Sequence, residues 1–151
     1  MGVTFPPRHG KYNLMLFRSF VTITAILTVS YAHSVEIVTS MPQQGIDINT
    51  RMIKAIFSGK AKYWPDGTPI KVITQPKDSS QHLNLCKDIL KVHPRQFSRN
   101  WDIVLFSGFG EKPILVESDQ EVLEKIKSTN GSIGYVNTTS EEGGIYVIQI
   151  K

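Results

Sequence analysis

The chain has 151 residues and a formal net charge of +4, but its charges are unevenly placed. Removing residues 1–32 takes away three of the 17 Lys and Arg and none of the 13 Asp and Glu, which leaves 119 residues with a net charge of +1. This remainder has no basic stripe, so we expect no nucleic-acid partner. It is long enough to bury a single core, and we therefore expect one domain at residues 33–151.

The first 32 residues have the layout of a secretory signal peptide. Basic residues precede an apolar run and a small-x-small motif: Arg8, Lys11, Arg18, residues 20–29 and Ser30-Tyr31-Ala32. The alternative is a membrane anchor, but the apolar run is shorter than the roughly 20 residues of a spanning helix. We therefore expect a signal peptide at residues 1–32 and a periplasmic mature protein, with Met15 as an alternative start.

The first half of the mature chain predicts two strands around one helix. Residues 35–39 and 70–74 are short β-branched runs, and each lies next to turn-forming residues. Between them, apolar residues recur at helical spacing over residues 48–57, and Gly59 fits the end of that helix. Strand, helix and strand predict a βαβ unit with parallel strands and a right-handed crossover.

The second half predicts three helices followed by two strands. Apolar stripes indicate helices over residues 83–90, 94–105 and 118–126, and Pro94 and a capping box from Ser118 to Glu121 mark two of the starts. Residues 132–136 and 145–150 have the composition of strands. The predicted order is β-α-β-α-α-α-β-β, which indicates an α/β fold.

The side chains give little support for catalysis or metal binding. The His, Cys, Asp and Glu residues show no metal-ligand spacing, and the chain has no G-x-S-x-G nucleophile motif. The single cysteine, Cys86, falls on the apolar face of a predicted helix, where we expect a buried and inert thiol. We predict a protein that is not an enzyme, with no catalytic residue, no metal ligand and no cofactor.

The junction at residues 75–85 is the best candidate for a binding site. A strand ends just before it and a helix begins inside it, so Ser79 and Ser80 lie beside the free amides of a helix N-terminus. Such a position suits a phosphate or sulfate. The alternative is structural: Asp78 or Ser79 caps the helix and stabilises it by about 1 kcal/mol.

Four segments along the mature chain occur in an order that is typical of one family. They are Ile56-Phe57-Ser58-Gly59, Trp64-Pro65-Asp66-Gly67, Asp78-Ser79-Ser80-Gln81 and Gly131-Ser132-Ile133-Gly134-Tyr135. Together they resemble the phosphate-binding periplasmic proteins of ABC transporters, and more closely the small relatives that share the type II periplasmic binding protein fold. The resemblance covers residues 35–150. It implies a reduced form of that fold. We also expect a monomer.

The resemblance also implies a site between two lobes. The first lobe would hold residues 35–74 and 145–150, the second residues 80–136, with the ligand over the helix start at Ser79. The donors available for a phosphate-like anion are the side chains of Thr39, Ser40, Ser79, Ser80 and Gln81 and the amides near Gly108 to Gly110. The large phosphate binders carry an Arg where this chain has Gln75-Pro76.

Two functions follow from this resemblance. The first is an exported solute-binding module that captures phosphate or a related oxyanion and serves an ABC permease. The second is a ligand-free interaction or sensory-accessory protein that kept the fold and binds a membrane sensor; the missing Arg favours it.

Overall fold

The computed structural model describes residues 1–4, 35–42, 48–108, 110–137 and 143–150. The chain forms two compact units, Met1–Tyr31 and Ala32–Lys151, and the fold belongs to the second. Apart from its first four residues, the predicted signal peptide lies outside the described residues. No helix among the described residues combines the length and apolar character needed to cross a membrane.

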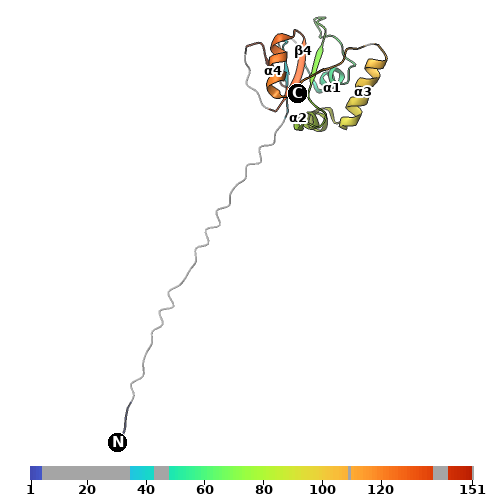
Figure 1. The fold of residues 1–151 in the computed structure, drawn as a ribbon. Helices are drawn as coiled ribbons and strands as arrows, with labels where there is room; N and C mark the ends of the chain where they lie inside the picture. Colours follow the sequence, from blue (N-terminus) through green and yellow to red (C-terminus); the bar gives the residue numbers. More distant parts are fainter. Residues whose placement is uncertain (5–34, 43–47, 109, 138–142, 151) are drawn as a thin grey trace. The chain divides into compact units, whose positions relative to one another are not determined.

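A five-stranded sheet forms the centre of this unit, in the order β3-β2-β4-β1-β5 (Figure 1). Its strands are β1 (Glu36–Thr39), β2 (Lys71–Thr74), β3 (Ile114–Leu115), β4 (Ser132–Val136) and β5 (Tyr146–Ile148). Strand β2 pairs in parallel with β3 and β4, whereas β1 pairs antiparallel with β4 and β5. Four strands therefore share one direction, and β1 runs against them.

The helices begin at the residues that the sequence marks for capping. They are α1 (Thr50–Phe57), α2 (Ser80–Asn84), the π-helix η1 (Leu85–Leu90), α3 (Pro94–Phe106) and α4 (Asp119–Ser128). The side chains of Asn49, Ser79 and Ser118 each accept a hydrogen bond from an amide in the first turn that follows. Pro94 opens α3 as predicted, because the first turn has no use for its missing N–H.

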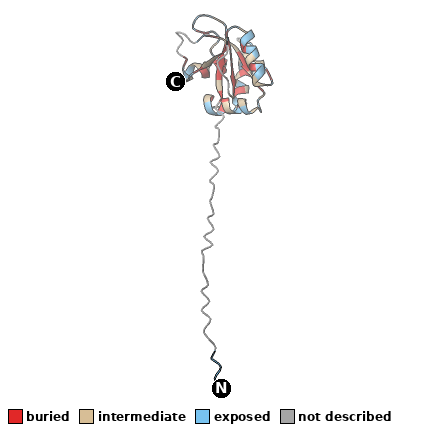
Figure 2. Cartoon of the chain, turned by 90° about the vertical axis from the view of Figure 1, so that its left-hand side faces the viewer, coloured by how far each residue is buried: buried red, intermediate tan, exposed pale blue. Residues whose placement is uncertain are grey.

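Alternation along the strands divides the core between the two faces of the sheet. Ile37, Val72 and Ile133 pack on one face with α1, η1 and α3, and their neighbours Val38 and Ile73 pack on the other face with α4. Buried residues accordingly concentrate on the strands and on the inward sides of the helices (Figure 2). The result is a three-layer α/β/α arrangement, and Cys86 is buried in it as expected.

The predicted βαβ unit is wrong in the direction of its strands. Strands β1 and β2 are not neighbours: β4 lies between them, antiparallel to β1 and parallel to β2. The rule for parallel strands applies when a helix carries the chain straight back to the same sheet edge. Here residues 58–70, with a bridge between Tyr63 and Pro69, follow α1 and reverse the chain before β2.

The predicted second lobe, residues 80–136, is also wrong. Strand β4 lies at the centre of the sheet and β3 at its edge, so both belong to the same layer as β1 and β2. Helix α3 and η1 pack into the same core cluster as β1. The described residues of this unit therefore share one sheet, and the two-residue strand β3 is an addition that the sequence did not predict.

The backbone at Gly131 packs closely against the backbone at Pro69, and this contact yields a test of the fold. Its φ is +73°, and a Cβ there would lie 2.3 Å from the carbonyl oxygen of Pro69. Its own carbonyl accepts hydrogen bonds from the indole of Trp64 and the amide of Lys71. We expect Gly131→Ala to lower the free energy of unfolding by about 3 kcal/mol in a urea titration, because backbone strain and a steric clash combine.

The matched control is Gly67→Ala. Gly67 also has a positive φ, +88°, but no atom lies within 4 Å of a Cβ placed there. We expect a loss of only about 1 kcal/mol, from backbone strain alone. Equal losses of unfolding free energy in the two variants would show that the backbones at Gly131 and Pro69 are not in close contact.

Candidate functional site

The carboxyl ends of β2 and β4 are where a ligand site is expected in this topology. From β2 the chain continues to β3 on one side, and from β4 it continues to β5 on the other side. The strand order therefore reverses between β2 and β4. In open α/β sheets, ligands bind outside the carboxyl ends of the strands at such a point. The residues that follow these two strands therefore decide what the position can hold.

The carboxylate of Asp119 occupies this position. Its Oδ1 accepts a hydrogen bond from Nε2 of Gln75 at 2.7 Å, and its Oδ2 accepts one from the backbone amide of Asn137 at 3.1 Å. Gln75 is buried, and the same Nε2 lies 3.2 Å from the carbonyl of Tyr135. The donors that could hold an external anion are thus bonded to an anion of the chain itself.

The hydroxyl of Tyr135 is the centre of a second group of contacts. It accepts a hydrogen bond from the amide of Gln75 at 2.8 Å, and Oγ1 of Thr74 lies 2.9 Å away. Nδ1 of His82 forms a hydrogen bond with it at 2.8 Å, and the tautomer of the imidazole sets which of the two groups donates. Nε2 of His82 lies 3.5 Å from Sγ of Cys86.

Burial keeps these groups neutral. It lowers the pKa of His82, raises the pKa of the Cys86 thiol to about 11 and raises the pKa of Tyr135 to about 12. His82 also packs edge-on against Phe97, with ring centroids 4.7 Å apart. A neutral imidazole and a protonated thiol in a packed core hold secondary structure together and offer no activated nucleophile.

The predicted ligand residues after β2 are engaged in local contacts. Oγ of Ser79 accepts a hydrogen bond from the amide of His82 at 3.1 Å, which makes Ser79 the N-cap of α2. Oγ of Ser80 donates to Oε1 of Gln81 at 3.0 Å. Capping, the structural alternative for Ser79, is therefore observed, and a ligand contact stays a proposal.

The other two predicted ligand residues lie at the opposite end of the sheet. Thr39 is buried, and its hydroxyl donates to the carbonyl of Ser132 at 2.7 Å. Oγ of Ser40 accepts a hydrogen bond from the amide of Ser132 at 3.0 Å. Because β1 runs antiparallel to β4, the end of β1 meets the start of β4, and the structure does not bring Thr39 and Ser40 together with Ser79, Ser80 and Gln81.

The sequence analysis did not single out four residues of the network as site residues: Gln75, His82, Asp119 and Tyr135. Gln75 was noted only as the position of a missing Arg, Asp119 only as part of a capping box, and Tyr135 only as part of a motif. The available signals were weak: Gln75 directly follows a buried strand, and His82 lies three residues after the cap Ser79. Their partners are far away in sequence, and local patterns do not reveal such pairs.

The buried imidazole predicts a pH dependence of stability. Because burial lowers the pKa of His82, the unfolded chain binds the proton more readily than the folded protein. The contribution of the neutral imidazole is complete above the unfolded pKa of about 6.5 and is lost as the pH falls below it. Between pH 7.5 and 5.5, we expect the native protein to lose about 1 kcal/mol more unfolding free energy than His82→Gln, measured by urea titration.

The control for this experiment is Gly67→Ala, which lowers stability and leaves every titratable side chain in place. This variant should lose as much stability on acidification as the native protein. If His82→Gln does the same, the buried imidazole is not the source of the pH dependence.

The comparisons with known proteins agree with this fold. A family model described as a PBP superfamily domain matches residues 24–146. An ABC-type phosphate transport receptor from Vibrio cholerae is 12% identical over 78% of this chain and 46% of its own, with a TM-score of 0.55. PstS from Borrelia burgdorferi is 21% identical over 68% of this chain and 40% of its own, with a TM-score of 0.43.

The chain thus spans less than half the length of these two structures. At 12% identity, the likeness to the Vibrio receptor is one of fold. No curated protein matches the sequence. The family match covers most of the chain, and the chain belongs to the PBP superfamily.

Proposed function

We propose that this chain is an exported, non-enzymatic protein of the periplasm that uses the PBP fold to bind a membrane protein, a sensor or an ABC permease, and does not itself trap phosphate. The observation that carries the proposal is the carboxylate of Asp119, bonded to Gln75 and Asn137 at the carboxyl ends of β2 and β4. An external anion at that position would meet a negative charge where it needs donors.

The energetics of anion capture support this choice. Micromolar affinity corresponds to about 8 kcal/mol. A helix terminus contributes up to about 2 kcal/mol, and each hydrogen bond to a charged group about 1.5–3 kcal/mol. Several donors from two sides are therefore needed. Thr39 and Ser40 lie at the far end of the sheet and bond Ser132, which leaves the donors around Ser79.

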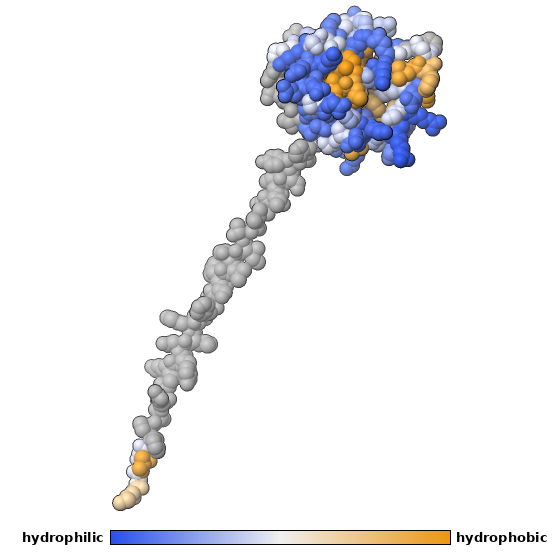
Figure 3. Space-filling model, in the orientation of Figure 1, coloured by the Kyte–Doolittle hydropathy of each residue, from blue (hydrophilic) through white to orange (hydrophobic). Residues whose placement is uncertain are grey.

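The surface supports an interaction role. On α3, Ile103 is 60% exposed and Phe106 is 92% exposed; three residues apart, they lie on the same side of the helix. Leu115, on the edge strand β3, is 56% exposed. Apolar areas also stand out among hydrophilic ones on the face in Figure 3. Large apolar side chains that are exposed to solvent favour contact with another protein.

A second candidate function is oxyanion binding at the start of α2. It is favoured by the hydroxyl of Ser79, which is bonded to the first-turn amide of His82, and by the neighbouring polar side chains of Ser80 and Gln81. This is the exported solute-binding module that the resemblance implies, with phosphate as the ligand. It predicts that phosphate binds the isolated chain and that Ser79→Ala removes the binding.

Calorimetry on the full chain separates the two functions. We expect no saturable heat with inorganic phosphate or sulfate up to about 10 mM, because the donors near Asp119 are already bonded. Asp119→Asn, which keeps an acceptor but removes the charge, serves as a comparison. Micromolar phosphate binding by the native chain, lost in Ser79→Ala, would replace the interaction role with capture.

Site-specific photo-crosslinking in intact cells tests the partner. A crosslinking amino acid at Phe106 should form one dominant adduct with a membrane sensor or permease, identified by mass spectrometry. The same group at Glu124, an exposed position on α4, is the control and should not form it. The interaction role is rejected if Phe106 gives no adduct with a membrane protein, or if both positions give the same adducts.

A further inference from the structure

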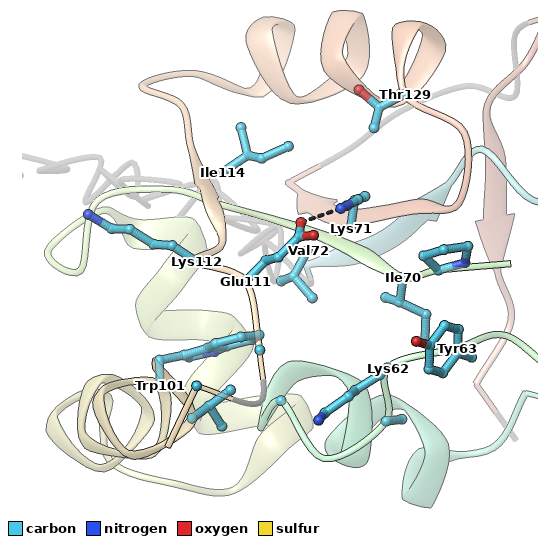
Figure 4. A pocket seen from close by; sticks show the side chains of 16 residues that line it. Lys62, Tyr63, Ile70, Lys71, Val72, Trp101, Glu111, Lys112, Ile114 and Thr129 are labelled. Atoms are coloured by element: carbon cyan, nitrogen blue, oxygen red, sulfur yellow. Dashed lines mark hydrogen bonds and ion pairs between the residues drawn. The ribbon is translucent and has the colours of Figure 1, made fainter. Parts of the chain in front are cut away.

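A groove of about 480 Å³ lies between the edge strand β3 and helix α4. It is lined by residues of these two elements and the residue after β3: Ile114, Leu115, Val116, Glu121, Glu124, Lys125 and Ser128. Figure 4 shows the chain passing from Glu111 through Ile114 toward α4, which forms the other wall of the groove. Because β3 is the outermost strand, no described strand lies on its far side, and the groove occupies that position.

The backbone of Leu115 faces this open edge. The amide of Val116 donates to the carbonyl of Thr74 in β2 at 3.0 Å. Successive residues of a strand direct their N–H and C=O groups to opposite sides, so those of Leu115 point away from β2. The next outward amide, that of Glu117, already donates to Oε2 of Glu121 at 3.0 Å. Leu115 therefore offers a donor and an acceptor to a strand from another chain.

The side chains of β3 determine how an added strand would be oriented. Ile114 and Val116 pack with the core cluster on the α4 side of the sheet. Leu115 lies between them, points to the other side and is 56% exposed. An added strand alternates in the same way, so every second side chain lies on the α4 side and the others lie beside Leu115.

The wall that α4 contributes is acidic. Glu121 and Glu124 line the groove against the single cation Lys125, and Glu117 is exposed just beyond β3. None of these three carboxylates forms an ion pair with another described residue. A cationic side chain on the α4 side of an added strand is complementary to this wall, whereas a second copy of the chain would bring like charges together.

We propose that this groove binds an extended peptide in which cationic and apolar side chains alternate, and that the peptide adds to β3 as a further strand. Its backbone bonds the N–H and C=O of Leu115, its cationic side chains lie beside Glu121 and Glu124, and its apolar side chains cover that of Leu115. Backbone hydrogen bonds then supply affinity, and the alternate side chains supply specificity.

This site goes beyond the proposed function, because it is a second surface of the protein. Ile103 and Phe106, which we assign to the membrane partner, belong to α3. Helix α3 packs in the core cluster on one face of the sheet, and α4 packs in the cluster on the other face. The two surfaces can therefore be tested separately.

The test is a calorimetric titration of the full chain with a short capped peptide of alternating valine and lysine. We expect saturable binding with a Kd below about 1 mM. The same peptide with glutamate in place of lysine should not bind up to about 5 mM, because the carboxylates of α4 repel it. The lysine peptide with N-methylated amides keeps every side chain but loses its donors, and it should bind at least about tenfold more weakly.

Variants of the protein test the same contacts from the other side. Leu115→Pro removes the outward N–H, and edge strands accept proline at such a position. It should weaken binding of the lysine peptide about tenfold, whereas Leu115→Ala keeps the N–H and should weaken it less. Glu124→Gln should weaken it about threefold. Asp102→Asn, which removes an exposed carboxylate from α3, is the matched control and should leave it unchanged.

Three results would each overturn the proposal: no saturation with the lysine peptide, equal binding of the lysine and glutamate peptides, or undiminished binding of the N-methylated peptide. Equal effects of Glu124→Gln and Asp102→Asn would reject the acidic wall as the source of specificity. If Leu115→Pro does not fold, the N-methylated peptide still tests the backbone hydrogen bonds. Phosphate heats and membrane-protein adducts at Phe106 are independent readouts, so failure here is distinct from failure of the proposed function.

Discussion

The hydroxyl of Tyr135 joins three elements that the rest of the structure depends on. It contacts the end of β2 through Thr74 and Gln75, contacts α2 through His82, and belongs to β4. Its ring packs edge-on against Phe57 of α1, with centroids 5.9 Å apart. Because the Tyr135 hydroxyl and its hydrogen-bond partners lie in the core, loss of one of these side chains would leave buried polar groups unsatisfied.

The hydrogen bond between Gln75 and Asp119 lies at the position that decides what this fold can hold. The reversal of strand order between β2 and β4 creates the position where α/β proteins usually bind ligands. In this chain, Gln75 and Asp119 meet at that position and satisfy one another. A fold shared with phosphate receptors is therefore compatible with a different use, since function resides in the site.

The two ends of the sheet have different chemistry. At the carboxyl ends, neutral groups and one paired carboxylate fill the space and stabilise the packing. At the amino end of β2, Thr39 and Ser40 bond Ser132. Trp64 and Lys71 donate to the carbonyl of Gly131. There, side chains mainly satisfy the backbone of neighbouring segments.

The sequence by itself determined the type and order of the elements apart from β3, because they depend on short-range physics. Short β-branched runs indicated the strands, and the 3.6-residue period indicated the helices. Ser79 and Ser118 marked helix starts through a hydrogen bond within one turn, and Pro94 marked one because it lacks an N–H. The motif order was specific enough to indicate the superfamily, which the family match confirms.

Only the tertiary structure decided the strand order, the direction of β1 and the composition of the site. Gln75 meets Asp119 across 44 positions and Tyr135 across 60, and no local pattern specifies such pairings. They form because β4 inserts next to β2. The antiparallel direction of β1 places Thr39 and Ser40 at the opposite end of the sheet from Ser79. Long-range packing of the whole core selects that insertion, so the residues on either side of it do not reveal it.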